Sequence, residues 1–323
     1  MSRRLSDCPK ARERPTARHV KPAPGGNDTR PQTAVVEINR KHKVHTEFYG
    51  NPAASKTIIL VNGSLATTAS FAQTIKYLQP QFNVVAFDLP YAGQSKPFNS
   101  DFTPISKEDE AAILLKLIDH YGANYLMSFS WGGVASMLAL AQRPASLEKA
   151  AICSFSPILN VPMLDYLHKG LRFLNAVDRD NIALLVNSTI GKHLPSLFKR
   201  FNHKHVSTLD EHEYRQMYAH IKQVLSMEAH CSMECLQAID IPLLFVNGDR
   251  DEYTSVEDAC LFAQHLDNAQ FAVIDDAGHF LDMEHKAAWL QTQSVLLEFF
   301  NAPSKRLQLP TRGDLRDLQA IAV

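Results

Sequence analysis

Six short apolar runs constrain the fold of this 323-residue chain more than any other feature of the sequence; they cover residues 56–61, 83–87, 124–127, 149–153, 241–246 and 270–274. Each run is nearly continuous, which is typical of a strand buried on both faces of a parallel sheet. Helical patterns separate the runs: one helix can be capped by Ser106, and others span 132–141, 256–266 and 286–300. The alternation predicts an α/β fold with a doubly wound, mostly parallel sheet, preceded by a hairpin over 34–38 and 44–48.

The alternation stops between residues 157 and 238, where the pattern is helical only. Helical spacing is clearest in Tyr214, Met217, Tyr218, Ile221, Val224 and Leu225. We therefore expect a core formed by 34–156 and 239–302, with an all-helical insertion at 157–238. An insertion of this size after a strand is expected to form a lid over an active site. A packed helical subdomain without that role is the alternative.

The two ends of the chain differ from its middle. Residues 1–33 carry eight Lys and Arg against three acidic residues, together with several prolines. We expect a disordered basic tail there and a loose C-terminal tail at 303–323. The N-terminal segment lacks the apolar centre of a secretory signal, while a transit peptide and an over-long gene start stay open.

Charge and cysteine usage exclude several classes of protein. The net charge of -1 gives no reason to expect nucleic acid as a partner, and no apolar run approaches the ~18 residues of a membrane span. Five cysteines without a disulfide-scaffold spacing favour a reducing cytoplasm. His230, Cys231 and Cys235 fall short of the four spaced ligands of a structural metal site, so neither a metal nor a bound cofactor is expected.

The segment Ser128-Phe129-Ser130-Trp131-Gly132-Gly133 joins a buried strand directly to a helix. This is the context of a nucleophile elbow, whose usual pattern is Gly-x-Ser-x-Gly. The turn is sharp and needs small flanking residues, and Ser128 in place of the first glycine is still small. Ser130 is therefore the candidate nucleophile, with a glycine-rich turn without chemistry as the alternative.

A serine hydroxyl needs a base, and two later runs end beside suitable residues. The run 241–246 is followed by Asp249 and Asp251, and the run 270–274 is followed by His279. The chain order Ser, Asp, His is that of the α/β-hydrolase triad. We expect His279 to accept the proton of Ser130 and Asp251 to orient His279, with Asp249 as the alternative acid.

An oxyanion needs two hydrogen-bond donors. One is the backbone N–H of Trp131, directly after the candidate nucleophile. The other is expected from Asn62-Gly63-Ser64, which follows the run 56–61, and the N–H of Ser64 is the candidate. The segment from Asp88 to Ser95 matches a loop that packs beside the oxyanion loop in many such folds.

With these residues, the chain resembles the α/β-hydrolase superfamily. It is most similar to one branch, the (R)-3-hydroxyacyl-ACP:CoA transacylases of polyhydroxyalkanoate synthesis, some of which are described as 3-hydroxyacyl-ACP thioesterases. The resemblance runs from about 34 to 300 and depends on the segments 62–71, 128–133, 191–195, 251–254 and 278–282. The first and last of these segments also occur in the synthases of the rhamnolipid precursor, whereas 154–157 and 197–202 look more like the transacylases.

The resemblance implies a two-step acyl transfer. Ser130 would take the acyl group of an (R)-3-hydroxyacyl-ACP and pass it to coenzyme A or to water. The product would supply medium-chain monomers for polyhydroxyalkanoate synthesis. The alternatives are hydroxyalkanoyloxy-alkanoate synthase, where a second hydroxyacyl is the acceptor, and a generic serine esterase.

The insertion carries a cluster of basic residues: Lys192, His193, Lys199, Arg200, His203, Lys204 and His205. Because acyl carrier protein is strongly acidic, we expect Lys192, Lys199, Arg200 and His205 to bind the donor or substrate, with a solvated helix face as the alternative. The transacylase group also has a His-x-x-x-x-Asp motif, here His205 and Asp210. We expect Asp210 to serve the start of a helix instead, where Thr208 and Glu211 predict a capping box, and His205 to line the acyl entrance.

Overall fold

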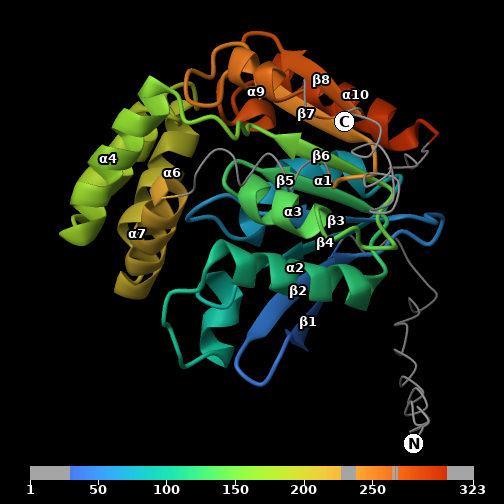
Figure 1. Ribbon diagram of the computed structural model, residues 1–323, viewed down its shortest axis with the longest axis horizontal. Helices are drawn as coiled ribbons and strands as arrows, with labels where there is room; N and C mark the ends of the chain where they lie inside the picture. Colours follow the sequence, from blue (N-terminus) through green and yellow to red (C-terminus); the bar gives the residue numbers. More distant parts are fainter. Residues whose placement is uncertain (1–29, 227–237, 264–265, 267, 304–323) are drawn as a thin grey trace, which may run out of the picture.

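An eight-stranded sheet forms the centre of the protein in a computed structural model that describes residues 30–226, 238–263, 266 and 268–303 (Figure 1). The strands are β1 (Gln32–Glu37), β2 (Lys43–Tyr49), β3 (Thr57–Val61), β4 (Asn83–Phe87), β5 (Tyr125–Phe129), β6 (Lys149–Cys153), β7 (Leu243–Gly248) and β8 (Ala269–Ile274). Their order is β1-β2-β4-β3-β5-β6-β7-β8, with the six strands from β4 to β8 parallel and the β1–β2 hairpin antiparallel. The predicted fold class is confirmed.

The apolar runs become strands because the central ones are covered on both faces. Every residue of β3 and of β6 is buried, as the continuous runs predict. The expectation is wrong for β8, which lies at the edge of the sheet and leaves Val273 43% exposed. The predicted boundary of the basic tail is also wrong at its end, since Gln32 and Thr33 already belong to β1. Residues 1–29 of that tail, the segment 227–237 with His230, Cys231 and Cys235, and residues 304–323 lie outside the described residues.

Helices cover both faces of the sheet. They are α1 (Ala72–Leu78), α2 (Lys107–Tyr121), α3 (Gly132–Leu140), α9 (Val256–Ala263) and α10 (Lys286–Asn301), with the short 3-10 turns η1 (Thr68–Phe71), η2 (Gly93–Phe98) and η3 (Leu281–Met283). One face is packed by α2 and α3, and the other by α1 and α10. The predicted cap of α2 is confirmed: the Ser106 hydroxyl accepts a hydrogen bond from the Asp109 N–H, and the Asp109 carboxylate accepts the Ser106 N–H. The patterns singled out in the sequence did not include α1.

In the described residues between β6 and β7, the chain forms four helices (Figure 1). They are α4 (Val161–Asn175), α5 (Arg179–Ser188), α6 (Ser196–Ser207) and α7 (Glu211–Ser226). These helices share their own buried apolar cluster, which includes Leu167, Tyr214 and Ile221. Trp131 of the core belongs to the same cluster. The helical insertion therefore packs directly on the residue that follows Ser130.

The start of α7 differs from the predicted capping box. The Thr208 hydroxyl donates to the Lys204 carbonyl at 2.7 Å, so it belongs to the end of α6. The carboxylate that accepts the Asp210 N–H, at 2.9 Å, is that of Glu213. Only one half of a capping box is present, and it lies two residues further on, because Thr208 is the C-cap of α6. Asp210 does lie at the start of α7, as expected.

None of the helices in the described ranges combines the length and the apolar character that crossing a bilayer requires.

Candidate active site

Ser130 lies in a sharp turn between β5 and α3. Its φ of 52° is in the left-handed region, which is uncommon for a residue other than glycine and is found where the surrounding structure enforces it. The Ser130 N–H donates to the Cys153 carbonyl of β6 at 2.8 Å, and the Gly133 N–H donates to the Ser130 carbonyl at 2.8 Å. A Cβ on Gly132 would lie 2.4 Å from the Asn62 carbonyl oxygen, so only glycine fits there. These contacts produce the strand–turn–helix geometry of a nucleophile elbow.

Ser128 occupies the first small position of the elbow pattern. Its side chain is fully buried, and its hydroxyl makes no hydrogen bond to any described residue. The position therefore accepts a serine without using its hydroxyl. The departure from the glycine pattern leaves the turn intact.

The structure brings together the three residues predicted from strand ends. The Oγ of Ser130 lies 2.9 Å from Nε2 of His279, and Nδ1 of His279 lies 2.8 Å from Oδ2 of Asp251. The distances are hydrogen-bonding distances, and all three side chains are buried. Asp249, the alternative acid, accepts instead the N–H of Ala277 at 3.1 Å. The geometry is that of a nucleophile, a base and an orienting acid.

Asp251 is held in its charged form. Burial by itself would raise its pKa, but the neighbouring His279 and hydrogen bonds from His279, Thr254 and the Tyr253 N–H outweigh burial. They lower the pKa of Asp251 to about 2. The carboxylate can therefore orient the imidazole and stabilise its protonated form throughout the neutral range.

Glu284 is a positioning residue that the sequence reasoning missed. Its buried carboxylate accepts the N–H of Gly278 at 2.7 Å and the N–H of Phe280 at 3.0 Å, one on each side of His279. The hydroxyl of Ser154 adds a hydrogen bond to the His279 carbonyl at 2.6 Å. The backbone of His279 is thus fixed on three sides. A glutamate five residues after the histidine was the available signal.

The loop between β3 and η1 (residues 62–67), which is expected to carry an oxyanion donor and is called the oxyanion loop, passes close to Ser130. A Cβ on Gly63 would lie 3.1 Å from the Cβ of Ser130 and 3.2 Å from the Phe129 carbonyl oxygen, so a side chain there would require these atoms to shift. Ser64 lines the same pocket as Ser130. The loop is supported by Asp88, whose carboxylate accepts the Thr68 N–H and the Gln94 N–H, both at 2.8 Å. The Asp88 loop therefore lies beside the oxyanion loop, as its pattern predicts.

The pocket at Ser130 is mostly apolar, with an empty volume of about 620 Å³ that is partly open to solvent. Its lining includes Ser130 and His279, Ile190 from the insertion, and Phe71, Met127 and Phe280 from the core. A medium-length acyl chain has the apolar character of this lining.

The predicted binding residues of the insertion do not converge on Ser130. Lys192 forms an ion pair with Glu252, and the Lys199 ammonium donates to the Lys192 carbonyl at 2.6 Å. Arg200 is exposed to solvent. His205 contacts the loop beside the site, because its Nε2 lies 2.7 Å from the Leu65 carbonyl oxygen, but it does not line the pocket at Ser130.

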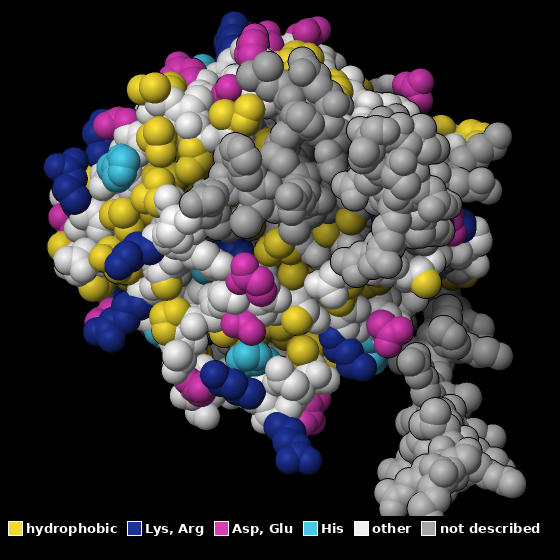
Figure 2. Space-filling model, viewed as in Figure 1, with side chains coloured by type: hydrophobic (Ala, Val, Ile, Leu, Met, Phe, Trp, Pro, Cys, Tyr) yellow, Lys and Arg dark blue, Asp and Glu magenta, His cyan; other side chains and the backbone are white. Residues whose placement is uncertain are grey.

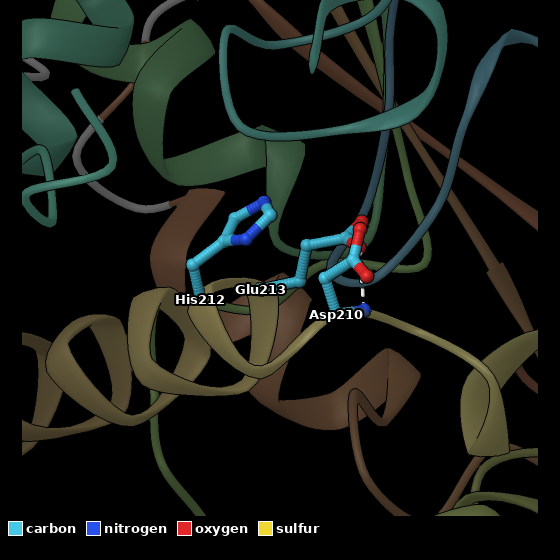
Figure 3. A group of neighbouring side chains, drawn as sticks. All are labelled: Asp210, His212 and Glu213. Atoms are coloured by element: carbon cyan, nitrogen blue, oxygen red, sulfur yellow. Dashed lines mark hydrogen bonds between the residues drawn. The ribbon is translucent and has the colours of Figure 1, made fainter. Parts of the chain in front are cut away.

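His205 and Asp210 do not form a pair. Figure 3 shows Asp210 with His212 and Glu213, and the carboxylates of Asp210 and Glu213 lie close to each other. The Lys96 ammonium contacts both carboxylates, at 2.6 and 2.9 Å, and so provides the positive charge there. His212 stacks on Phe102 and bonds the Tyr91 carbonyl. We assign no metal to this cluster, which ties the start of α7 to the core.

Comparison with known proteins agrees with this geometry. Residues 56–286 match the α/β hydrolase fold family. An α/β hydrolase enzyme from a Medee basin deep-sea metagenome library has a similar structure, with a TM-score of 0.69 and 17% identity over 85% of this chain and 100% of that one. The class that the fold and site define is therefore that of the α/β hydrolases.

More similar relatives narrow this class. The (R)-3-hydroxydecanoyl-ACP:CoA transacylase of Pseudomonas aeruginosa is 61% identical over 84% of this chain and 90% of its own length. The protein of the same name from Pseudomonas putida is 56% identical over 88% of this chain and 98% of its own length. The chain belongs to the α/β-hydrolase family and, within it, to the family of these transacylases.

Proposed function

We propose that the protein transfers an (R)-3-hydroxyacyl group from acyl carrier protein to coenzyme A through an acyl-enzyme on Ser130. The observation that carries this proposal is the hydrogen-bonded chain from Ser130 through His279 to Asp251, which opens on a mostly apolar pocket. The substrate class comes from the transacylases to which the chain is similar over most of its length.

In the first step, His279 accepts the hydroxyl proton as Oγ of Ser130 attacks the carbonyl carbon of the thioester. The N–H groups of Ser64 and Trp131 stabilise the negative charge that develops on the carbonyl oxygen. The C–S bond then breaks, and His279 gives its proton to the departing thiolate of the carrier protein. The product is an ester of Ser130 and a free carrier thiol.

In the second step, the thiol of coenzyme A loses its proton to His279 and attacks the Ser130 ester. The C–O bond breaks, Ser130 recovers the proton, and 3-hydroxyacyl-CoA leaves. Water in place of the thiol would give a free 3-hydroxy acid. The thioester product is an activated monomer suited to polyhydroxyalkanoate synthesis.

The donor is proposed to bind on the outer face of α6. Its exposed residues Leu197, Arg200, Phe201 and Lys204 follow helical spacing, so apolar and basic side chains alternate along one stripe. Figure 2 shows hydrophobic, basic and acidic side chains intermingled on the left of the molecule, where α4, α6 and α7 lie. An acidic carrier protein complements such a surface. Of the residues predicted from sequence, Arg200 fits this position best.

The deciding experiment mixes the purified protein with 3-hydroxydecanoyl-ACP, with and without coenzyme A, and identifies the products by mass spectrometry. The proposal expects 3-hydroxydecanoyl-CoA when coenzyme A is present. Free acid in its place would make the enzyme a thioesterase, and a dimeric ester would make it a hydroxyalkanoyloxy-alkanoate synthase. Arg200→Glu is expected to raise KM for the ACP substrate severalfold, with little change in kcat.

A further inference from the structure

A cluster of three polar residues interrupts the apolar wall of the pocket at Ser130, on the side formed by α1, η3 and α10. Its members are Thr74, Asp282 and Thr292, which line the same pocket as Ser130 and His279. The catalytic mechanism proposed above uses none of the three. Their neighbours in the lining include Phe71, Met127, Leu281 and Met283. An acyl chain without polar groups would not require such a cluster.

Asp282 is the centre of this cluster. Its Oδ2 accepts hydrogen bonds from the Thr74 hydroxyl and the Tyr77 hydroxyl, each at 2.9 Å. Burial raises the pKa of Asp282, against the opposing effect of these two donors. Asp282 is half-buried in the wall of the pocket, where water is partly excluded and a further hydrogen bond is worth more than in bulk water.

Thr292 gives the second, independent observation. Its side chain is 1% exposed, and its hydroxyl hydrogen-bonds no other residue in the described part of the chain. A buried hydroxyl without a partner costs stability, so buried hydroxyls are nearly always paired. Thr292 lines the pocket, so a molecule bound there would lie against its side chain.

We propose that Asp282 and Thr292 form a subsite that hydrogen-bonds the 3-hydroxyl group of the acyl chain and makes the enzyme prefer hydroxyacyl to plain acyl thioesters. The inference rests on the proposed function and specifies its substrate selection. Asp282 follows His279 by three residues, and the Met283 N–H donates to the Phe280 carbonyl at 2.9 Å, which turns this segment back beside the site. The 3-hydroxyl is likewise only two carbons from the carbonyl that Ser130 attacks.

The selectivity follows from the polar groups of the pocket that an acyl chain without the hydroxyl would leave unpaired. An apolar pocket by itself separates two chains that differ by one hydroxyl only weakly. A pocket that hydrogen-bonds the hydroxyl rejects the chain that lacks it, because its own buried polar groups then stay unpaired. The apolar part of the pocket would hold the remainder of either chain equally.

Thr292→Val is the sharpest test, because valine keeps the shape of the side chain and removes only a hydroxyl that hydrogen-bonds no other described residue. The measurement is kcat/KM for 3-hydroxydecanoyl and for decanoyl thioesters of the same carrier, and the readout is their ratio. We expect the wild type to favour the hydroxyacyl substrate and Thr292→Val to reduce the ratio about tenfold, mainly through slower hydroxyacyl transfer. Asp282→Asn is expected to reduce the ratio at least as much.

Ser136→Ala is the matched control. Ser136 in α3 also has a fully buried hydroxyl without a partner among the described residues, but it does not line the pocket. Its substitution is expected to leave the ratio unchanged. Thermal melting of each variant checks the fold, and Thr292→Val is expected to melt no lower than the wild type.

The outcomes separate the subsite from the proposed function. Equal losses on both substrates in Thr292→Val and Asp282→Asn would mean a structural role only and would overturn the subsite. A wild type that transfers both acyl groups equally well would also overturn it while leaving acyl transfer through Ser130 intact. If neither thioester is turned over, the proposed function fails and the subsite fails with it.

Discussion

The sheet edge at which the parallel strands end, here called the sheet edge, and the helical insertion hold their functional residues in different ways. At the edge, Ser130 and Asp251 follow buried parallel strands, and backbone hydrogen bonds fix their turns. His279 follows the outermost strand β8, and the side chains of Glu284 and Ser154 fix its backbone. The insertion meets the core largely through side chains. Asn160 donates to the Glu252 carbonyl at 2.9 Å and to Asp258 at 2.7 Å, and Lys96 contacts Asp210 and Glu213.

The difference predicts where the molecule tolerates change. Backbone contacts at the sheet edge leave no room for an added atom, because a displaced carbonyl would disturb its neighbours in turn. Side-chain contacts can adjust by rotamer changes at small cost. The rigid region is therefore suited to positioning reacting atoms, and the insertion to admitting substrates.

The largest expected effect is at the rigid edge. Ser130→Ala should reduce acyl transfer by about 10⁴-fold or more, because the nucleophile is lost while the pocket remains. The thermal midpoint should stay within a few degrees of the wild type, since only a hydroxyl is removed. Steady-state turnover of 3-hydroxydecanoyl-ACP measures the first effect and thermal melting the second. Full activity in the purified variant would remove Ser130 from the mechanism; Ser136→Ala serves as the control for preparation effects.

Gly132→Ala tests the rigidity of the same edge without removing a reacting group. The added Cβ would lie 2.4 Å from the Asn62 carbonyl oxygen and 2.8 Å from that of Val61. Both are backbone atoms, so the oxyanion loop must move. We expect a loss of about 3 kcal/mol in unfolding free energy, measured in urea, together with a large loss of activity. A variant with wild-type stability would show that the edge yields more easily than its packing implies.

The positions that could be predicted from sequence belong to the same rigid region. Apolar runs mark β3 to β8, and the carboxyl ends of parallel strands meet at one edge, so the proximity of Ser130, Asp251 and His279 follows from their places after those runs. For β3 to β7, the apolar pattern of each strand and its place in the sheet both depend on burial on two faces.

The contacts of the insertion could not be predicted in this way. The bond from His205 to the Leu65 carbonyl joins residues 140 positions apart, and that from Lys96 to Asp210 joins residues 114 apart. Neither contact leaves a periodic trace, because each depends on how the insertion packs on the core. The start of α7 was misplaced for a related reason, since Thr208 is the C-cap of the neighbouring helix α6.

One contact between the regions is buried and should respond to pH. His220 of α7 lies against Glu110 of α2, near Lys107 and Tyr91. Burial, and then Lys107, lower the pKa of His220 to about 4 against the opposing effect of Glu110. Between pH 6.5 and 4, His220 therefore binds a proton in the unfolded chain but not in the folded chain. The unfolding free energy falls as the pH falls through this window.

His220→Gln should remove this acid sensitivity, because glutamine does not titrate. From pH 7.5 to 5 the wild type is expected to lose about 2 kcal/mol more unfolding free energy than the variant. Urea unfolding at both pH values measures the difference. His168→Gln, which replaces an exposed histidine of α4, is the control and should behave as the wild type does. If the wild type and His220→Gln lose the same unfolding free energy, the contact of His220 with Glu110 is not the acid-sensitive one.

The smallest expected effect has the opposite sign and lies wholly within the insertion. Gly170 is inside α4, and a Cβ there would meet Cδ1 of Ile221 at 3.5 Å, an ordinary van der Waals contact with a side chain that can adjust. Because alanine favours the helix over glycine, Gly170→Ala should raise the unfolding free energy by about 0.5–1 kcal/mol. The same exchange of glycine for alanine would then destabilise the sheet edge at Gly132 and stabilise the insertion. A loss of stability at both glycines would mean that the insertion is packed as rigidly as the sheet edge, and its proposed part in admitting substrates would lose its physical basis.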